Sequence, residues 1–575
     1  MKKLLTILIA LCTLQIELCA AEPLPTILSE NDAANYAKIF SLQDAGKISA
    51  AAKLEKELES DILMGEVLYQ RYMSKNYASK GVEVAEWMEK YYNHPGAETM
   101  FKLSMRKKVL AREAALPTMA SAKYDGGAYS ESWTTRKYSG STGREIGRFQ
   151  ANLKRRNLKT CATILENKGV KTNVSWTDYG RLAGRLAFTL YNGGEMEEAT
   201  KWGAVAAERN SEIGLWTMGL LSFKNADFAA AEKYFAAMLE LEHINMNRKV
   251  EAAFWAGRSA DEADDGRAAR KHWRYAMQRP ASFYGAMSAA ALGREPDYEF
   301  YEDVISRDDI ANLMKTKYGL IALALLQAGQ NERAEGHLRY LITDRASDDL
   351  LHAVHALATS EELPRTALAV APIIKERGIL EIDSNVILSA QFPLPQWEPR
   401  GGWEIDRALL FAIARQESRF KTNAKSHAGA TGLLQLMPKT AKLTAVKSGI
   451  KMNSLDLTNP EDSMFLGQQH VLDLFALENV DNNIIKMLVS YNAGNGNLRK
   501  FERRFETDDP LLYIESFHLP ETRGYIKIVM SNLWLYRARL GQPMSNLNDL
   551  VHGRWPRYSA HDDYANRRSE EKNIN

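Results

Sequence analysis

The sequence contains few cysteines and little net charge. Cys12, Cys19 and Cys161 are the three cysteines among 575 residues, and the formal net charge is +2. A nearly neutral chain has no cationic excess to neutralise phosphates, so we expect no nucleic-acid partner. We expect Cys12 and Cys19 to be removed with an N-terminal leader, which leaves Cys161 unable to form an internal disulfide. No histidine is close to Cys161 in sequence, and we predict that it is a buried, unreactive side chain.

Long hydrophobic runs are also scarce. The apolar run from Leu4 to Leu14 is too short to span a bilayer, which takes about 20 residues. Lys2 and Lys3 precede it and Cys19-Ala20-Ala21 follows, a pattern typical of a secretory signal peptide over residues 1–21. A buried N-terminal helix is the alternative. A lipid anchor is disfavoured because Leu18 is bulky, and we expect no integral membrane segment after signal removal.

The pattern after the leader predicts an all-α protein. From about residue 30 to 390, alanine and leucine recur at three- and four-residue spacing, which is typical of amphipathic helices. Short similar units recur with periods in the thirties and favour stacked helical hairpins, with an irregular helical domain as the alternative. Ser121–Gly147 is rich in glycine and serine and is predicted to be a long loop, and a proline- and glycine-rich boundary covers Phe392–Gly402.

These features predict five regions. They are a signal peptide (1–21), an N-terminal helical superhelix (22–300), a helical linker domain (301–392), a catalytic domain (393–550) and a polar, disordered tail (551–575).

Acidic residues are missing from one stretch of the catalytic region. No Asp or Glu occurs between Ser418 and Ser454, although lysine and arginine are frequent there. Immediately before this stretch, Glu417 continues an apolar stripe of a helix predicted over Ile405–Gln416. A carboxyl group in an apolar setting has a raised pKa, which suits a general acid near neutral pH. The alternative is a helix-end carboxylate that turns to solvent.

Several polar and aromatic residues follow Glu417. Gln435 and Met437 lie in an apolar segment after a run of small residues. Tyr491 and Asn492 begin a glycine-containing turn, and Glu521 and Tyr525 are four apart on a helix predicted after Pro520, so they share one face. Each also has an ordinary structural interpretation, such as core packing, a turn, or a carboxylate favoured by a helix dipole. Spacing alone predicts only a helical domain with a polar cleft.

Four motifs in order give a specific resemblance. They are Glu417-Ser418-Arg419-Phe420 with Ser426, Gly429 to Pro438, Ser490 to Gly494, and Glu521 to Tyr525. Their order and separation resemble the soluble lytic transglycosylases of glycoside hydrolase family 23. The resemblance implies a lysozyme-like α domain after a long helical superhelix. Thr422 and Ser490 depart from the residues common in that family.

The resemblance also implies an activity. Such enzymes cut the β-1,4 bond between N-acetylmuramic acid and N-acetylglucosamine in periplasmic peptidoglycan and leave a 1,6-anhydromuramyl end. Glu417 would be the single acid and base, and the substrate's own C6 hydroxyl would replace water. By the same resemblance, the substrate-binding residues would be Ser426, Gln435, Met437, Tyr491, Asn492, Glu521 and Tyr525.

Two other functions stay open at this point. A lysozyme-type hydrolase on the same fold would need a second carboxylate, and Glu521 is the candidate. A non-catalytic peptidoglycan-binding scaffold is the other, and the helical array could bind cell-wall proteins in either case. The histidines show no metal-ligand spacing and there is no phosphate-binding loop, so we expect no metal and no cofactor.

Overall fold

The computed structural model describes residues 22–120, 134–380 and 386–562. The predicted signal peptide therefore lies outside the described residues. The chain divides into two compact units that are each discontinuous in sequence. The first comprises Met1–Ala122, Tyr301–Glu381 and Leu388–Pro395, and the second comprises Lys123–Phe300, Ile382–Ile387 and Gln396–Asn575.

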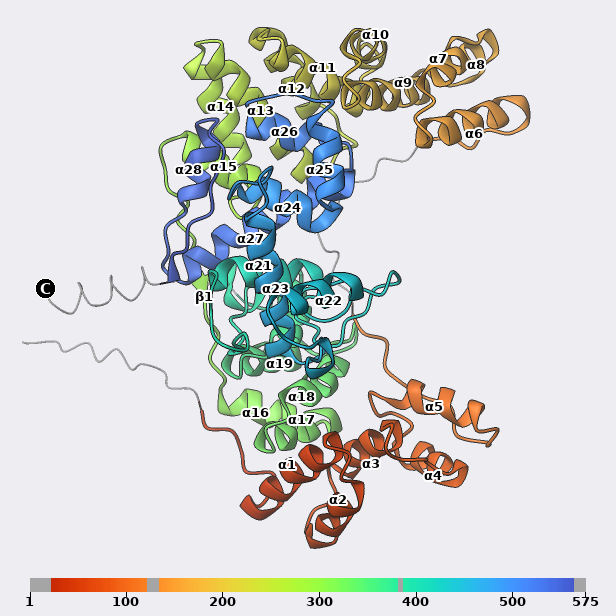
Figure 1. The fold of residues 1–575 in the computed structure, drawn as a ribbon, viewed down its shortest axis with the longest axis vertical. Coiled ribbons are helices and arrows are strands. Elements are labelled where there is room, and N and C mark those ends of the chain that lie inside the picture. The colour runs from red at the N-terminus through yellow and green to blue at the C-terminus, as the bar shows by residue number, and fades with distance from the viewer. Residues whose placement is uncertain (1–21, 121–133, 381–385, 563–575) are drawn as a thin grey trace, which may run out of the picture. The chain divides into compact units, whose positions relative to one another are not determined.

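Helices dominate the first unit, coloured red to orange and green in Figure 1. The hydrophobic core of its N-terminal part forms where Val84, Trp87 and Met88 meet Ala97 and Met100. Its helices are α1 (Glu30–Asp44), α2 (Ile48–Leu54), η1 (Glu55–Glu57), α3 (Met64–Met73), α4 (Gly81–Tyr91), α5 (Ala97–Arg106), α16 (Arg307–Met314), α17 (Lys317–Gln327), α18 (Asn331–Leu338), η2 (Arg339–Leu341), α19 (Asp348–Ser360), α20 (Pro364–Arg377) and η3 (Ser389–Gln391).

The second unit joins a helical array to the region with the predicted chemistry. Its array helices are α6 (Gly140–Lys154), α7 (Leu158–Glu166), α8 (Lys168–Asn173), α9 (Trp176–Tyr191), α10 (Met196–Ala207), α11 (Glu212–Lys224), α12 (Phe228–Leu239), α13 (Met246–Glu262), α14 (Gly266–Ala276) and α15 (Phe283–Ala291). The later helices are α21 (Arg407–Glu417), α22 (Pro438–Lys447), η4 (Met452–Ser454), α23 (Pro460–Phe475), α24 (Ile484–Ala493), α25 (Asn495–Glu502), α26 (Pro510–Ser516), α27 (Pro520–Arg539) and α28 (Ser545–Val551). Two-residue strands, β1 (Phe300–Tyr301) and β2 (Ile387–Leu388), form a small sheet.

The predicted helical hairpins are confirmed, and equivalent positions show why they repeat. Asp227 and Asp265 accept hydrogen bonds from backbone N–H groups in the first turns of α12 and α14. Such N-caps satisfy amide groups that have no partner inside the helix. Gly219 lies against Phe235, where an added Cβ would approach the ring to 2.6 Å. The spacing between such repeated positions falls in the thirties, as the sequence predicted.

Cys161 is buried in the second unit, as predicted. Its side chain is fully buried in α7, and its Sγ lies 3.7 Å from the carbonyl oxygen of Phe149. Burial raises the pKa of the Cys161 thiol to about 11. The thiol is therefore protonated at neutral pH and unsuited to nucleophilic chemistry.

Two boundary predictions need correction. The predicted Ser121–Gly147 loop is wrong over residues 140–147, because α6 begins at Gly140. Glycine and serine are common in loops, but they are also common at the N-cap of a helix, so composition alone did not indicate the start of α6. The predicted disordered tail is wrong up to residue 562, because Tyr558 stacks on Phe475 with ring centroids 4.8 Å apart. Residues 563–575 lie outside the described residues. Within the described ranges, no helix is long and apolar enough to cross a membrane.

Candidate active site

Glu417 is the last residue of α21, on the apolar side that the sequence predicted. Leu410, Ile413 and Ala414 on this helix are at most 2% exposed. After Ser418, Arg419 and Phe420 adopt left-handed backbone conformations, with φ of 50° and 60°. Left-handed conformations are costly for residues with a Cβ atom. Here the turn returns Phe420 to the core beside Phe411, with ring centroids 6.1 Å apart, and leaves Glu417 at the helix end.

The loop after this turn is held by its own side chains. The Ser426 hydroxyl accepts a hydrogen bond of 3.0 Å from the Ala430 N–H. The Gln435 side-chain amide donates to the carbonyl oxygens of Ala424 (3.2 Å) and Gly432 (2.8 Å). Ser426 and Gln435 therefore fix the shape of the loop, whatever else they contact. Met437, at the loop's end, is 42% exposed.

Gly432 shows how tightly this loop is packed. Its φ is +82°, and a Cβ atom added there would lie 2.1 Å from the carbonyl oxygen of Leu457. Only glycine tolerates both conditions. The run of small residues seen in the sequence thus reflects a close approach of two backbone segments.

Two tyrosines surround the acid. Tyr491, near the end of α24, and Tyr525, in the second turn of α27, have nearly parallel rings with centroids 6.4 Å apart. The Tyr491 hydroxyl donates a 2.6 Å hydrogen bond to the carbonyl oxygen of Leu434. Burial, together with the negative charge of Glu417, raises the pKa of both tyrosines well above the ordinary value. Both hydroxyls therefore keep their protons and can only donate or accept hydrogen bonds.

The electrostatic state of Glu417 follows from its burial. Desolvation raises the pKa of Glu417 to about 7, the Tyr525 hydroxyl opposes the shift, and Glu521 adds to it. Glu521, in the first turn of α27, is exposed, so the two carboxyl groups occupy different environments. A carboxyl group that titrates near pH 7 can both give and take a proton at neutral pH.

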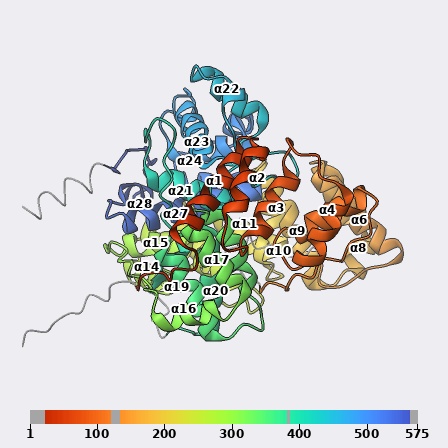
Figure 2. The ribbon, with the colours of Figure 1, turned by 90° about the horizontal axis from the view of Figure 1, so that it is seen from below.

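The structure brings the remaining predicted residues to the same place. Asn492 is connected to α27 because the Thr522 hydroxyl donates a 2.7 Å hydrogen bond to its side-chain oxygen. Glu417, Tyr491, Asn492, Glu521 and Tyr525 thus come together from α21, α24 and α27. Ser426, Gln435 and Met437 belong to the adjoining loop, which Tyr491 contacts through Leu434. In both Figure 1 and Figure 2, α22, α23 and α24 lie beside one another within this region.

Two neighbours were missed by the sequence analysis. Thr522 lies within the motif from Glu521 to Tyr525, and its position there predicted no role for it. His470, on α23, packs its ring against Tyr491 with centroids 5.4 Å apart, and burial lowers the pKa of His470 to about 4. His470 is therefore uncharged at physiological pH. Nothing in its sequence surroundings indicated this contact.

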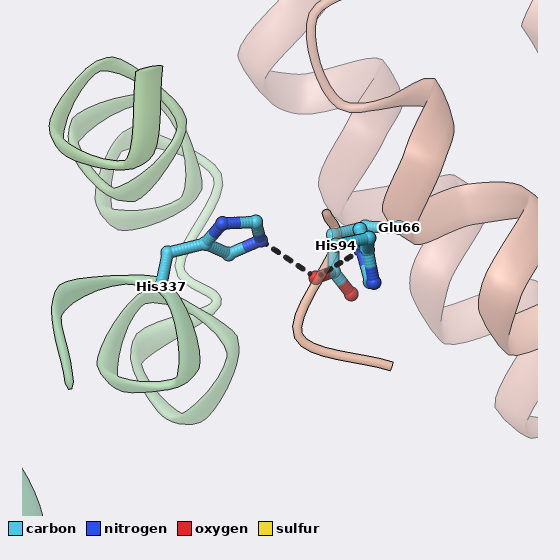
Figure 3. Close-up of side chains that lie close together, drawn as sticks. All are labelled: Glu66, His94 and His337. Carbon is cyan, nitrogen blue, oxygen red and sulfur yellow. Dashed lines mark hydrogen bonds and ion pairs between the residues drawn. The ribbon is translucent and has the colours of Figure 1, made fainter. Parts of the chain in front are cut away.

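A second cluster of chemical interest lies in the first unit, away from these residues in sequence. Glu66, His94 and His337 converge from α3, the α4–α5 connection and α18, and both imidazole Nε2 atoms lie 2.8 Å from Glu66 Oε1 (Figure 3). All three side chains are buried. Spacing along the chain could not indicate this group, because its members come from three distant segments.

The hydrogen bonds of this cluster argue against a metal. The Gly96 N–H donates to His94 Nδ1 at 2.9 Å, so Nδ1 carries no proton and the ring proton of His94 is on Nε2, the nitrogen that faces Glu66. Arg333 lies 3.3 Å from the other Glu66 oxygen and already balances its charge. A divalent ion on His94 Nε2 would have to replace the proton there, and together with Arg333 it would leave excess buried positive charge. The contact between Glu66 and His337 links α3 with α18, and His337 Nδ1 has no hydrogen-bond partner among the residues that the structure describes.

The comparisons with known proteins agree with the motifs. Residues 398–513 match the family model described as Transglycosylase SLT domain. The Soluble lytic murein transglycosylase of Salmonella typhimurium is 33% identical over 156 residues, covering 26% of this chain and 23% of that protein. The Putative soluble lytic murein transglycosylase of Haemophilus influenzae is 36% identical over 135 residues, covering 23% and 22%. The chain thus matches about a quarter of the length of these relatives, and Glu521 and Tyr525 lie beyond the matched range 398–513.

Solved structures extend the likeness to the whole fold. The lytic transglycosylase Slt of Pseudomonas aeruginosa, solved as an inactive mutant, matches with a TM-score of 0.57 and 18% identity, over 90% of this chain and 80% of that one. A 70-kDa soluble lytic transglycosylase in complex with bulgecin A matches with a TM-score of 0.55 and 16% identity, over 92% and 100%. At this identity the match concerns the fold. The predicted all-α architecture of a helical superhelix followed by a lysozyme-like domain is confirmed.

Proposed function

We propose that this protein is a periplasmic lytic transglycosylase that cleaves the β-1,4 bond between N-acetylmuramic acid and N-acetylglucosamine in peptidoglycan and forms 1,6-anhydromuramyl ends. One observation carries the proposal: a partly buried glutamate with a pKa near 7 ends α21 inside the segment that matches the Transglycosylase SLT domain. Peptidoglycan glycan strands are the substrate, and the activity would serve cell-wall turnover.

The first step uses the protonated form of Glu417. Its carboxyl group donates a proton to the glycosidic oxygen as the bond between that oxygen and the muramyl C1 breaks. Positive charge develops at C1, and the 2-acetamido group of the substrate stabilises it. Glu417 is then a carboxylate, beside two tyrosine hydroxyls that remain protonated.

The second step uses the same residue as a base. The Glu417 carboxylate accepts the proton of the C6 hydroxyl while the C6 oxygen bonds to C1, and the anhydro ring closes. The acid is regenerated, and no water is consumed. A pKa near 7 suits both steps, because the two forms are then close in free energy at neutral pH.

The surrounding residues divide the work of binding. Tyr491 and Ser426 would hold the acetamido and glycosidic region, and Met437 and Asn492 would line the sugar subsites. Tyr525 would tune Glu417, since its hydroxyl stabilises the ionised form. Gln435 would act chiefly through the loop that it holds together.

Hydrolysis on the same fold is the second candidate, and one observation favours it. Glu521 is close enough to Glu417 to raise its pKa, so a second carboxylate is present at the site. An inverting hydrolase needs such a carboxylate to activate water on the opposite face of the sugar.

Product analysis separates the two activities. Purified peptidoglycan would be digested with the wild-type protein and with the Glu521→Gln variant, and the muropeptides identified by mass spectrometry. We expect anhydromuramyl ends from both proteins. Reducing ends that disappear in Glu521→Gln would establish hydrolysis instead. If neither protein releases fragments, the non-catalytic scaffold becomes the better interpretation.

A further inference from the structure

Helix α27 has two functional sides. Tyr525 and Lys527 are two residues apart, which places them about 200° apart around an α-helix. Tyr525 is on the side of Glu417 and Tyr491. Lys527 therefore points away from the proposed cleft, toward the helical array of the same unit.

Lys527 reaches two carboxylates on other helices. Its Nζ donates to Glu251 of α13 at 2.7 Å and to Glu515 of α26 at 3.0 Å. The same Glu515 oxygen accepts a 2.5 Å hydrogen bond from the Tyr284 hydroxyl of α15. The amine thus bonds α27 to α13 and α26, and Glu515 extends the connection to α15 of the array.

The charges continue into the array. Arg248 donates to Glu251 and to Glu212 of α11, both at 2.6 Å. Glu212 and Glu515 side chains are only 2% exposed, and Lys527 is 15% exposed. We call Glu212, Arg248, Glu251, Glu515 and Lys527 the charge ladder. Burial lowers the pKa of Lys527, but Glu251 and Glu515 outweigh it and the pKa is raised, so the amine stays charged.

The hydrogen bonds of Lys527 restrict the position of α27. Buried ion pairs add little net stability compared with apolar packing, but removing one partner leaves an uncompensated charge. Their geometry is narrow, so the ladder fixes where α27 can lie relative to α13 and α26. Tyr525 is half a turn away on the same helix, and a displacement of 1 Å at a reacting site can cost about 100-fold in rate.

We propose that Lys527 is a positioning residue that fixes α27 to the helical array and thereby sets Tyr525 against Glu417. The array then has a part in catalysis besides any binding role, since α13 and α15 supply groups of the hydrogen-bond network that holds α27. This inference rests on the proposed function.

The test compares full-length Lys527→Met with the wild type on a soluble glycan oligomer. The assay temperature would be well below the melting temperature of both proteins. We expect the kcat of Lys527→Met to be about 10- to 100-fold lower than that of the wild type, with a KM within threefold of the wild-type value. Loss of the Tyr525 contact would raise the pKa of Glu417, so the basic limb of the kcat profile should move to higher pH. Lys527→Arg, which retains the charge and a donor, should recover most of the rate.

Two further variants make the result decisive. Lys249→Met is the matched control, because Lys249 is on α13, the helix that carries Glu251, but donates to the Leu239 carbonyl within the array. It should keep the wild-type kcat and pH profile. Glu251→Gln serves if Lys527→Met does not fold. Removing a negative charge would lower the Glu417 pKa by electrostatics alone, whereas loss of positioning would raise it.

The outcomes separate this inference from the proposed function. An inactive wild type would overturn both. An active wild type with unchanged kcat and pH profile in Lys527→Met and Glu251→Gln would overturn the positioning role alone, even if the melting temperature falls.

Discussion

Two partly buried glutamates in the second unit have opposite shifts of their pKa. Burial raises the pKa of Glu417 to about 7, whereas Glu251, despite burial that acts in the same direction, has a pKa lowered to about 2 by Lys527 and Arg248. The difference lies in the partners and not in the depth. In the cleft, Glu417 has tyrosine hydroxyls and the Glu521 carboxylate as neighbours. In the array, Glu251 has two cations, Lys527 and Arg248, as neighbours. Desolvation therefore raises the pKa of a carboxyl group toward neutrality where no cation lies beside it.

A third glutamate limits what acidity alone can show. Burial also raises the pKa of Glu335 in the first unit to about 7. Glu335, however, accepts hydrogen bonds from the N–H groups of Arg365 (2.7 Å) and Thr366 (3.1 Å) at the start of α20. It caps a helix. The neighbours of a perturbed acid, and not its pKa, separate chemistry from structure.

The largest expected difference in activity is between variants of Glu417 and Glu335, the two glutamates whose pKa is raised to about 7. Glu417→Gln removes the proton donor while keeping its shape, and we expect peptidoglycan cleavage to fall by at least about 10³-fold. Glu335→Gln is the matched control and should retain activity within a few-fold at a temperature below its melting point. Equal activity of Glu417→Gln and wild type would refute the assignment.

The pH dependence should follow from the protonation state of Glu417. Only the protonated form can donate to the glycosidic oxygen, so kcat should fall as pH rises through about 7. Well above that pH the fall should approach tenfold per unit. Initial rates between pH 5 and 9 check this, and a flat profile up to pH 9 would contradict it.

The same two acidities predict opposite stability effects of Gln substitutions. A raised folded-state pKa costs stability as pH rises from 4.5 through 7, so Glu417→Gln should be more stable than wild type by about 1–3 kcal/mol at pH 8 and equal at pH 4. A lowered pKa adds stability above 4.5 that is lost as pH falls through 2. Glu251→Gln should therefore be less stable by about 2 kcal/mol at pH 7, with the deficit shrinking in acid. Denaturant unfolding at each pH measures the free energy of unfolding of both variants. A change of the same sign in the two variants would contradict the prediction.

The smallest expected effect concerns the link between α24 and α27. Thr522→Val removes the hydroxyl that bonds Asn492 and should cost about 1 kcal/mol, seen as a few-fold rise in KM. Thr522→Ser retains the hydroxyl and serves as the control. A larger effect in Thr522→Ser than in Thr522→Val would show that the methyl group, and not the hydrogen bond, matters.

Much of the site was predictable because its signals are local. The apolar stripe that leads to Glu417 and the pairing of Glu521 with Tyr525 on one face both follow from helical periodicity. The small residues around Gly432 indicated a close approach before its partner, Leu457, was known. By contrast, the actual role of Gln435 in its loop depends on carbonyl groups that fold back onto it. His470 and the charge ladder depend on helices distant in sequence.

The sequence by itself determined the helical repeats, the buried cysteine and the position of the acid, because caps, small residues and apolar periodicity act over one or two turns. Tertiary structure alone decided which acids are paired. In the sequence, nothing distinguishes the acidities of three helical glutamates, Glu417, Glu251 and Glu335. Their environments differ because distant segments bring cations, amides or hydroxyl groups beside them. Desolvation and charge pairing depend on three-dimensional surroundings, which spacing along a chain does not encode.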